Sequence, residues 1–266
     1  MPGQVIDHEA RRRAGLALYG EIMQRPHAEP DSPRTAALID FVYAEIWSRP
    51  LLTRRERRLI TMACLAGADA HTGLADHFYG ALKSADLTLE ELDEFVLHFA
   101  VYCGWGKAEE AERILDAQWA QVNRELGSKA PARGRHPVSS VPQDQELRKQ
   151  GGEQEFRDVN CVPAPGRGIP YSDDGILNFV FGDMWKRPGL SRRDRRWITL
   201  ACVGLDDTII PVRSHVYSAM KSGDITLEEM REMVLQFAAY SGWPKGSFMQ
   251  QTVEEEWARV ASESST

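Results

Sequence analysis

Histidine and tyrosine recur at one fixed spacing in this chain of 266 residues. His77 and His215 are separated by the same offset as Tyr102 and Tyr240 (215 − 77 = 240 − 102 = 138). Histidine is the side chain best matched to proton transfer near neutral pH, and a tyrosine hydroxyl can donate a hydrogen bond into a pocket. Both types can also be packed core residues, and a duplication copies structural residues too. The pattern is compatible with acid–base chemistry without a cofactor and does not prove it.

Two arginine-rich runs precede these residues, RRERR at Arg54–Arg58 and RRDRR at Arg192–Arg196. Most of each run is expected to be the solvated face of a helix. One arginine of each run, Arg57 or Arg195, lies directly before an apolar segment, and we expect it to turn inward. A guanidinium group binds a carboxylate through two parallel hydrogen bonds, so an inward arginine would suit an anionic small-molecule substrate.

The repeated residues belong to a duplicated segment. Residues 41–105 match residues 179–243 without a gap, and a period this long, seen twice, indicates a duplicated domain. Residues 127–145 are rich in Gly, Pro, Ser and basic residues, which is typical of a linker. We therefore expect a first domain over residues 1–126 and a second over residues 146–266.

The elements that position the repeated residues are predicted to be helices. Apolar residues recur at helical spacing, and no stretch shows sustained period-two alternation. Gly104 and Gly242 are expected to end the most apolar helix of each copy. Capping boxes, which satisfy backbone N–H groups of a first turn, are written at Thr53–Glu56, Thr88–Glu91, Ser191–Asp194 and Thr226–Glu229. The predicted fold class is all-α, with two tandem helical bundles.

Composition and charge exclude several classes of protein. The net charge is −7 and no basic tract is present, which argues against a nucleic-acid partner. No apolar run approaches the roughly 20 residues that span a bilayer, and the first residues carry no apolar signal core. We therefore expect a cytoplasmic protein with no membrane partner. The four cysteines form no C-x-x-C pair, and no phosphate loop or H-E-x-x-H motif appears, so we expect no metal and no cofactor.

The ordered motifs resemble the carboxymuconolactone decarboxylase family, which shares its fold with the alkylhydroperoxidase (AhpD) proteins. The matching motifs are W-S-R-P-L-L at 47–52, W-K-R-P-G-L at 185–190, H-x-x-x-A-[LM] at 77–82 and 215–220, T-x-E-E at 88–91 and 226–229, and Y-x-G-W at 102–105 and 240–243. The peroxidase branch of this fold carries a C-x-x-C before the helix histidine. Those positions are Ala70 and Gly73 in the first copy and Thr208 and Pro211 in the second, so we expect no dithiol peroxidase activity.

The resemblance implies a cofactor-independent, decarboxylase-like lyase that acts on a small carboxylated lactone or ring-cleavage product. By resemblance, the acid/base would be His77 or His215, the oxyanion donor Tyr102 or Tyr240, and the carboxylate clamp Arg57 or Arg195. We also expect Trp105 and Trp243, which end the Y-x-G-W motifs, among the substrate-binding residues. An isomerase, a hydrolase or a rearrangement enzyme would use nearly the same groups. A non-catalytic scaffold that kept the fold is a further alternative.

The two sites are expected to be unequal. His98 belongs to the first copy only, since the second copy has Gln236, and only the histidine can shuttle a proton in this pH range. We therefore expect His77 to carry the acid/base role with His98 and Tyr102 near it. By resemblance, Pro244 favours the second copy instead. Single-copy relatives form rings built from dimers, so resemblance and symmetry predict a homo-oligomer, a trimer of this double chain.

Overall fold

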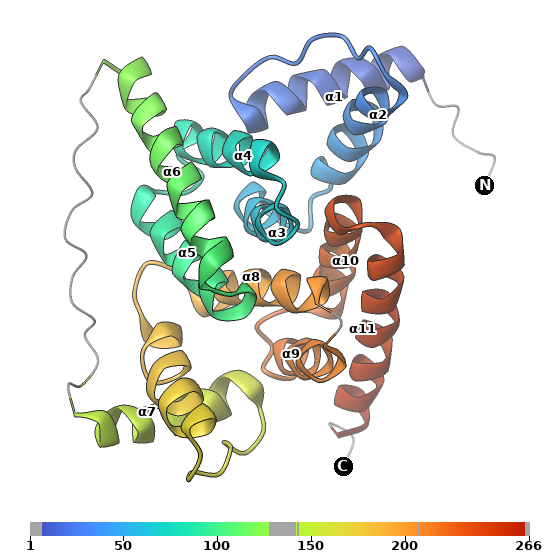
Figure 1. Cartoon of the computed structure of the whole chain (residues 1–266). Coiled ribbons are helices and arrows are strands. Elements are labelled where there is room, and N and C mark those ends of the chain that lie inside the picture. Colours follow the sequence, from blue (N-terminus) through green and yellow to red (C-terminus); the bar gives the residue numbers. More distant parts are fainter. Residues whose placement is uncertain (1–6, 128–141, 143, 207, 264–266) are drawn as a thin grey trace.

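The computed structural model describes residues 7–127, 142, 144–206 and 208–263, and every regular element in these ranges is a helix (Figure 1). The first half contains α1 (His8–Met23), α2 (Pro33–Ala37), a π-helical segment (Leu38–Trp47), α3 (Arg54–Gly67), α4 (His71–Ser84), α5 (Leu89–Cys103) and α6 (Trp105–Glu125). The second half contains α7 (Gln145–Asn160), a π-helical segment (Tyr171–Val180), a 3₁₀ turn (Met184–Lys186), α8 (Arg192–Leu205), α9 (Ile209–Lys221), α10 (Leu227–Ser241) and α11 (Trp243–Glu263). The four helices α3–α6 recur in the same order as α8–α11, each set after a π-helical segment, which confirms the all-α tandem fold.

The predicted helix boundaries agree with the structure. All four capping boxes form, and in each the side chain at the cap accepts from the third backbone N–H while the acidic side chain binds the cap N–H. Gly104 and Gly242 follow α5 and α10 with φ values of 93° and 96°. Glycine adopts positive φ without steric cost, which explains why it stands at both ends. The expected linker, residues 127–145, lies largely outside the described residues.

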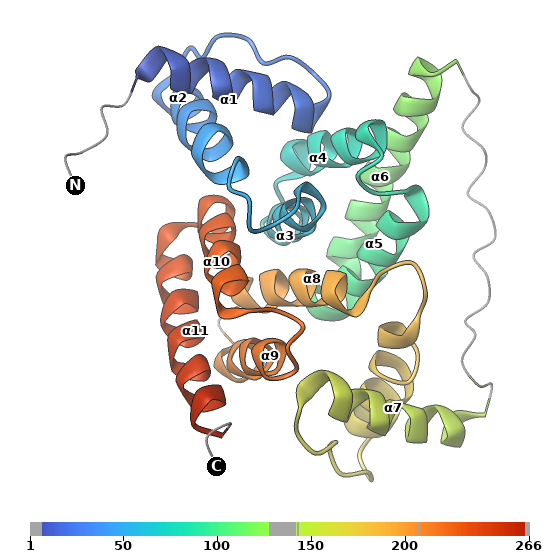
Figure 2. The same ribbon diagram turned by 180° about the vertical axis from the view of Figure 1, so that it is seen from behind.

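The two halves share one core and are not separate units. Figures 1 and 2 show α5 of the first half beside α8 of the second, and α10 of the second half beside α3 of the first. The main buried apolar cluster takes residues from both halves, including Phe95, Phe99, Trp197 and Phe237. One face of α5 and one face of α10 therefore pack against the opposite half of the chain.

The arginine runs form much of this contact, and the prediction of a largely solvated face is wrong for them. Arg57 and Arg195 turn inward as expected, and so do their neighbours Arg58 and Arg196. All four side chains are fully buried. Burial is possible because each buried guanidinium group meets a carboxylate and other acceptors of the protein.

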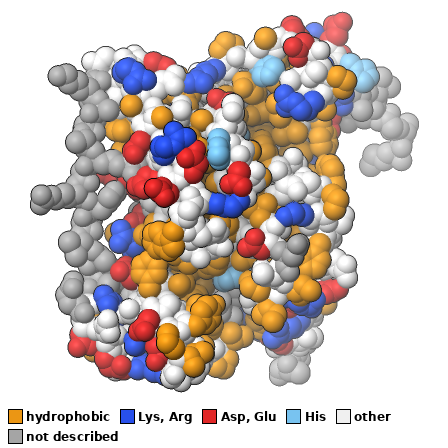
Figure 3. Space-filling model, in the orientation of Figure 1, with side chains coloured by type: hydrophobic (Ala, Val, Ile, Leu, Met, Phe, Trp, Pro, Cys, Tyr) orange, Lys and Arg blue, Asp and Glu red, His pale blue; other side chains and the backbone are white. Residues whose placement is uncertain are grey.

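The less buried arginines of the runs connect the halves by ion pairs. Arg55 of α3 binds Asp194 of α8 at 3.1 Å, and Arg193 of α8 binds Glu56 of α3 at 2.6 Å. Asp194 and Glu56 are also the acidic members of the capping boxes, so the helix starts and the contact between halves are built from the same side chains. On the outside, acidic and basic side chains are interspersed over the face in Figure 3. No described helix is long and apolar enough to cross a membrane.

Two composite candidate sites

Polar side chains form matching ladders where α5 packs on α8 and α10 on α3. On α5, Glu94, His98 and Tyr102 are four residues apart, and on α8 Arg195 and Thr199 are four apart. Residues at this spacing lie on one face of a helix, so the two ladders face each other. The duplicated ladder consists of Glu232, Gln236 and Tyr240 on α10 and Arg57 and Thr61 on α3.

Each ladder supports one of the two repeated histidines, and we name the centres after them. The His215 centre comprises His215, Tyr102, His98, Thr199, Arg195, Glu94 and Trp185. The His77 centre comprises His77, Tyr240, Gln236, Thr61, Arg57, Glu232 and Trp47. Both centres combine residues from the two halves, so neither half holds a complete centre.

In the His215 centre, hydrogen bonds run from Arg195 towards Tyr102. Arg195 Nη2 binds Glu94 Oε2 at 3.2 Å, and its Nη1 lies 3.4 Å from His98 Nδ1. His98 Nε2 lies 2.8 Å from Thr199 Oγ1. Trp185 Nε1 donates to the Tyr102 hydroxyl at 3.1 Å. His98 therefore has a partner at each ring nitrogen, and the Tyr102 oxygen is held in place by an indole N–H.

The His77 centre repeats this arrangement with an amide in place of the imidazole. Arg57 Nη1 donates to Gln236 Oε1 at 2.9 Å, and Gln236 Nε2 donates to Thr61 Oγ1 at 2.9 Å. Trp47 Nε1 donates to the Tyr240 hydroxyl at 2.9 Å. Gln236 and His98 therefore make equivalent contacts, although only one of them can titrate.

The repeated histidines lie beside the tyrosines that the ladders hold. The His77 ring stacks on Trp47 with centroids 5.7 Å apart and meets Tyr240 edge-on at 6.0 Å. The His215 ring meets Tyr102 edge-on at 5.6 Å. The expectation that His98 and Tyr102 lie near His77 is therefore wrong. They belong to the other centre because α5 packs on α8 of the opposite half.

Both histidines are buried and carry an unpartnered nitrogen. His77 is 2% exposed and His215 8% exposed, and within the described residues the Nδ1 of neither ring has a hydrogen-bond partner. Burial lowers the pKa of each histidine to about 3, helped by the positive charge of Arg58 near His77 and of Arg196 near His215. Each imidazole is therefore neutral at pH 7 and can accept a proton.

The tyrosines keep their protons at neutral pH. Burial raises the pKa of Tyr102 and of Tyr240 to about 12, although hydrogen bonds with Thr199 and Trp185, or with Trp47 and Thr61, oppose the shift. A protonated phenol that is fixed by its neighbours is a suitable donor to a developing oxyanion. Burial and the charge of Arg195 hold the pKa of His98 well below its usual range, so His98 is not poised to change charge near pH 7.

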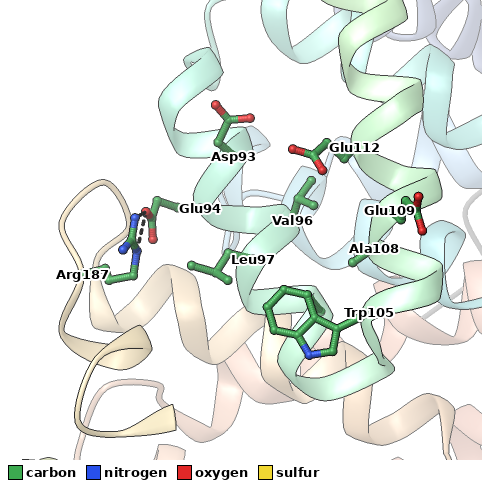
Figure 4. Close-up of a pocket in the computed structure, with 10 residues that line it drawn as sticks. Asp93, Glu94, Val96, Leu97, Trp105, Ala108, Glu109, Glu112 and Arg187 are labelled. Atoms are coloured by element: carbon green, nitrogen blue, oxygen red, sulfur yellow. Dashed lines mark hydrogen bonds and ion pairs between the residues drawn. The ribbon is translucent and has the colours of Figure 1, made fainter. Parts of the chain in front are cut away.

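The inward arginines bind carboxylates of the protein itself. Glu94 is shared by Arg195 at 3.2 Å and Arg187 at 2.8 Å, and Figure 4 shows the Arg187 contact. The duplicated Glu232 is shared by Arg57 at 3.2 Å and Arg49 at 2.8 Å. The hydrogen bond from Arg49 is the main reason that the pKa of Glu232 is lowered. Arg57 and Arg195 thus each bind a carboxylate of the chain itself, whereas the resemblance implied a clamp for the carboxylate of the substrate.

A cavity of about 480 Å³ opens onto His215 and Tyr102. Its described lining is mostly apolar, and none of these residues is lysine or arginine. Sequence reasoning did not select the other lining residues, which include Phe156, Tyr171, Phe181, Ile210 and Ser214. Part of the lining lies before residue 179, where the gapless match between the halves begins, so the repeat gave no signal for Phe156, Asn160, Tyr171, Gly175 and Ile176. Phe181 lies within the match, where it aligns with Tyr43.

Trp105 and Trp243 lie away from the two histidines. Their side chains are 63% and 55% exposed, and each begins the last helix of its half. Trp105 lines a separate cavity of about 540 Å³, which has the Arg187–Glu94 pair at one end (Figure 4). Trp243 lines the duplicated cavity, of about 460 Å³. The described lining of these two cavities includes neither His77 nor His215, so the expected role of the two tryptophans in substrate binding stays a prediction.

The comparison with protein families agrees with this duplicated arrangement. The model of the carboxymuconolactone decarboxylase family matches residues 35–117 and 170–249, which together make up more than half of the chain. The chain belongs to the carboxymuconolactone decarboxylase family. The two matches fall one in each half, and together they include every residue of both centres.

Two curated relatives of the family are similar to part of the chain. Nitrosuccinic acid decarboxylase of Metarhizium robertsii is 36% identical over 72 residues, which are 27% of this chain and 50% of that protein. The 4-carboxymuconolactone decarboxylase of Acinetobacter baylyi is 31% identical over 83 residues, or 30% of this chain and 59% of that protein. The matched part thus spans between half and three fifths of each relative. In the described part of the chain, no three His, Cys, Asp or Glu side chains are grouped so as to hold a metal ion.

Proposed function

We propose that this member of the carboxymuconolactone decarboxylase family is a decarboxylase-like lyase for a small carboxylated molecule, with its working site at the His215 centre. The observation that carries the proposal is the juxtaposition there of a neutral histidine, a fixed tyrosine hydroxyl and a cavity of about 480 Å³. The names of both curated relatives support the reaction class. The choice of His215 replaces the earlier preference for His77.

The lining of the cavity would favour the loss of CO₂ over tight binding of the carboxylate. A carboxylate holds its charge on two oxygens, whereas the transition state spreads that charge into the rest of the molecule. A mostly apolar wall that includes Asp206 and no lysine or arginine therefore destabilises the bound carboxylate more than the transition state. The guanidinium group of Arg195 stays with Glu94 and supports the centre from behind.

His215 would carry the proton that the reaction consumes. Decarboxylation converts R–COO⁻ and one proton into R–H and CO₂. In the free protein the imidazole is neutral, and a bound carboxylate raises its pKa so that it takes up a proton from solvent. When the C–C bond breaks, the electron pair passes into a conjugated carbonyl or nitro group of the substrate. The imidazolium then delivers its proton to carbon and returns to the neutral form.

Tyr102 would stabilise the charge that appears on the substrate oxygen. Its phenol stays protonated because its pKa is raised to about 12 by burial, so it donates a hydrogen bond without losing the proton. Trp185 holds the phenol oxygen from the side at 3.1 Å. A donor that is already fixed in place needs no reorganisation during the reaction, which is the source of its catalytic effect.

A CO₂-release assay tests the proposal. The full chain is incubated with a panel of conjugated carboxylactones, β-keto acids and α-nitro acids, beside the double variant His77→Ala/His215→Ala. We expect CO₂ release from at least one compound by the native chain, and its loss in the double variant. Isomerisation or hydrolysis of a panel compound without CO₂ release would refute the lyase and favour the other reactions of the same pocket. Equal CO₂ release by the double variant would refute the role of histidine.

A further inference from the structure

The directions of the hydrogen bonds in the His215 centre can be worked out from its one-way donors. Arginine has only donors, so the Arg195 N–H that lies 3.4 Å from His98 Nδ1 must give its hydrogen to that nitrogen. A neutral His98 then carries its own proton on Nε2 and donates it to Thr199 Oγ1 at 2.8 Å. Because Thr199 accepts there, its hydroxyl proton is free to point elsewhere.

The next group in line is the Tyr102 hydroxyl. The Thr199 side chain interacts with this hydroxyl, and because Thr199 Oγ1 already accepts from His98, its own hydroxyl proton is the one that it can offer to the phenol oxygen. Trp185 Nε1 is also a donor only, and it binds the same oxygen at 3.1 Å. With both lone-pair directions of its oxygen taken, Tyr102 keeps one hydrogen-bonding capacity, its own O–H, on the side of the cavity and His215.

The His77 centre gives an independent reading of the same direction. There Arg57 donates to Gln236 Oε1, and Gln236 Nε2 donates to Thr61 Oγ1, each at 2.9 Å. An amide has one end that only accepts and one that only donates, so the direction follows from its contacts. Glutamine thus does with its oxygen and nitrogen what His98 does with Nδ1 and Nε2. Gln236 occupies the position equivalent to His98. It keeps the same direction of hydrogen bonding, and it differs only in that it cannot titrate.

We propose that His98 and Thr199 are positioning residues that transmit one direction of hydrogen bonding from Arg195 to Tyr102, and so make the Tyr102 hydroxyl a donor into the cavity. His98 is then not a proton shuttle, in contrast to the expectation from its residue type. The direction itself does not depend on the reaction, whereas its catalytic consequence rests on the proposed function. Aligned donors that start at a buried cation polarise one another, so the last O–H in the line becomes a stronger donor.

The direction is tested by the tautomer of His98 in the full chain. Imidazole ¹⁵N–¹H correlation spectra of labelled protein are recorded from pH 5 to pH 8, and the His98 signals are assigned by their loss in His98→Gln. We expect a neutral ring with the proton on Nε2 throughout this range. A proton on Nδ1, or an imidazolium at pH 7, would overturn the proposal. This measurement uses the native chain and needs no substrate, so it stands whether or not CO₂ is released.

The catalytic consequence is tested with matched variants at the same positions. Thr199→Val removes the hydroxyl and keeps the shape, and Thr199→Ser keeps the hydroxyl. His98→Gln places in the His215 centre the residue that the His77 centre has as Gln236. On a compound that releases CO₂, we expect Thr199→Val to lower kcat with KM little changed, by less than the about 10²–10³-fold expected for Tyr102→Phe. Thr199→Ser and His98→Gln should retain kcat, and Thr61→Val serves as the control in the other centre.

The outcomes separate the two proposals. Loss of kcat in His98→Gln would mean that the titration of His98 matters, which overturns the positioning role. Full kcat in Thr199→Val would overturn the catalytic consequence. If no compound releases CO₂, the proposed function fails, and the tautomer of His98 still decides the direction of the hydrogen bonds.

Discussion

The His77 and His215 centres share one framework and differ in what surrounds the tyrosine hydroxyl. In the His77 centre, Tyr43 stacks on Trp47 and its hydroxyl interacts with that of Tyr240. In the His215 centre, Phe181 stacks in the same way on Trp185 and offers no hydroxyl. The two centres therefore hold the tyrosine with equivalent tryptophans, but they differ in how open the tyrosine hydroxyl is to a ligand. The difference favours the His215 centre, where Phe181 leaves the tyrosine hydroxyl open to a ligand.

The surroundings of the two histidines differ in charge as well. Asp76 precedes His77 and binds Arg25 at 3.3 Å, while Arg25 also lies over the ring of Tyr79. The equivalent of Asp76 is Ser214, which lines the apolar cavity at His215. His77 thus has an ion pair beside it, whereas His215 has a mostly apolar cavity beside it. The environments of the two histidines have diverged, although the hydrogen-bonded ladders that support them have stayed the same.

The largest expected effect comes from the histidines taken singly. His215→Ala should lower kcat for CO₂ release by about 10²–10⁴-fold, the usual loss when a general acid/base is removed. His77→Ala is the matched control and should retain most of the rate. The measurement is kcat on any compound that the native chain decarboxylates. The reverse pattern would assign the reaction to His77, and equal losses would show two working centres.

Much of the fold could be predicted from sequence, because it depends on local signals. The gapless repeat predicted equal helix order, and capping boxes such as Thr53–Glu56 predicted helix starts, since each works within one turn. The inward turn of Arg57 and Arg195 was predicted by the apolar segment that follows each. The deep burial of Arg58 was not, because it requires Asp86, which lies on the loop between α4 and α5.

The pairing of site residues could not be predicted, because it depends on which helices pack together. Linear proximity within the first half suggested that Tyr102 would serve His77, whereas α5 packs on α8 and brings it to His215. The ladder threonines and tryptophans were also missed as site residues. A signal existed for them. In each copy a threonine follows the inward arginine by four residues, and a tryptophan opens the repeated W-x-R-P motif. The sequence alone does not show that these side chains converge.

Removal of the shared glutamate, Glu94 or Glu232, is expected to lower the free energy of unfolding by different amounts in the two centres. Glu94→Ala leaves Arg195 and Arg187 without their carboxylate, and loss of one partner of a buried pair costs about 3–5 kcal/mol. Glu232→Ala should cost less, because Arg49 is 48% exposed and can be solvated, whereas Arg187 is 18% exposed. Urea unfolding at pH 7 measures both values.

The exposed Glu9→Ala is the control for these variants, with an expected change within about 0.5 kcal/mol. If Glu94→Ala costs no more than Glu232→Ala, the difference in exposure of the two outer arginines has no energetic consequence. The two carboxylates would then be equivalent, and this part of the comparison would fail.

A lower pH should reduce the stability of the protein through both histidines equally, and by less than the loss of Glu94. Burial lowers the pKa of His77 and of His215 to about 3, from an ordinary value of 6.5 that returns on unfolding. Between about pH 6.5 and about pH 3 the unfolded chain binds more protons, so stability falls as the pH falls. At pH 5 each histidine should cost about 2 kcal/mol relative to pH 7.

Denaturant unfolding at pH 7 and pH 5 checks this prediction with His77→Gln and His215→Gln. Each variant should lose about 2 kcal/mol less than the native chain between the two pH values. A variant with the same acid loss as the native chain would show that its histidine titrates normally in the folded protein, and that its centre is hydrated.

The smallest expected effect comes from exchanging the residue that faces the tyrosine hydroxyl. Phe181 stacks on Trp185 with centroids 5.9 Å apart and an interplanar angle of 8°, close to the 6.1 Å and 10° of Tyr43 on Trp47. In Phe181→Tyr the new hydroxyl should therefore reach Tyr102 as Tyr43 reaches Tyr240. The two hydroxyls would hydrogen-bond each other, and this contact would compete with the substrate for Tyr102. One neutral hydrogen bond is worth about 1 kcal/mol, so kcat should fall about fivefold.

Tyr43→Phe is the reciprocal exchange, and it tests whether this contact keeps the His77 centre idle. If the contact with the Tyr43 hydroxyl keeps a ligand from Tyr240, its removal should give the His215→Ala background a measurable rate, because the Tyr240 hydroxyl beside His77 would then be open to a ligand. The ion pair of Arg25 and Asp76 remains, so this rate should stay below that of the native His215 centre. No rate in the double variant would mean that the environment of His77, rather than Tyr43, separates the two centres. A gain of rate in Phe181→Tyr would contradict the argument that a second phenol competes with the substrate for the tyrosine hydroxyl.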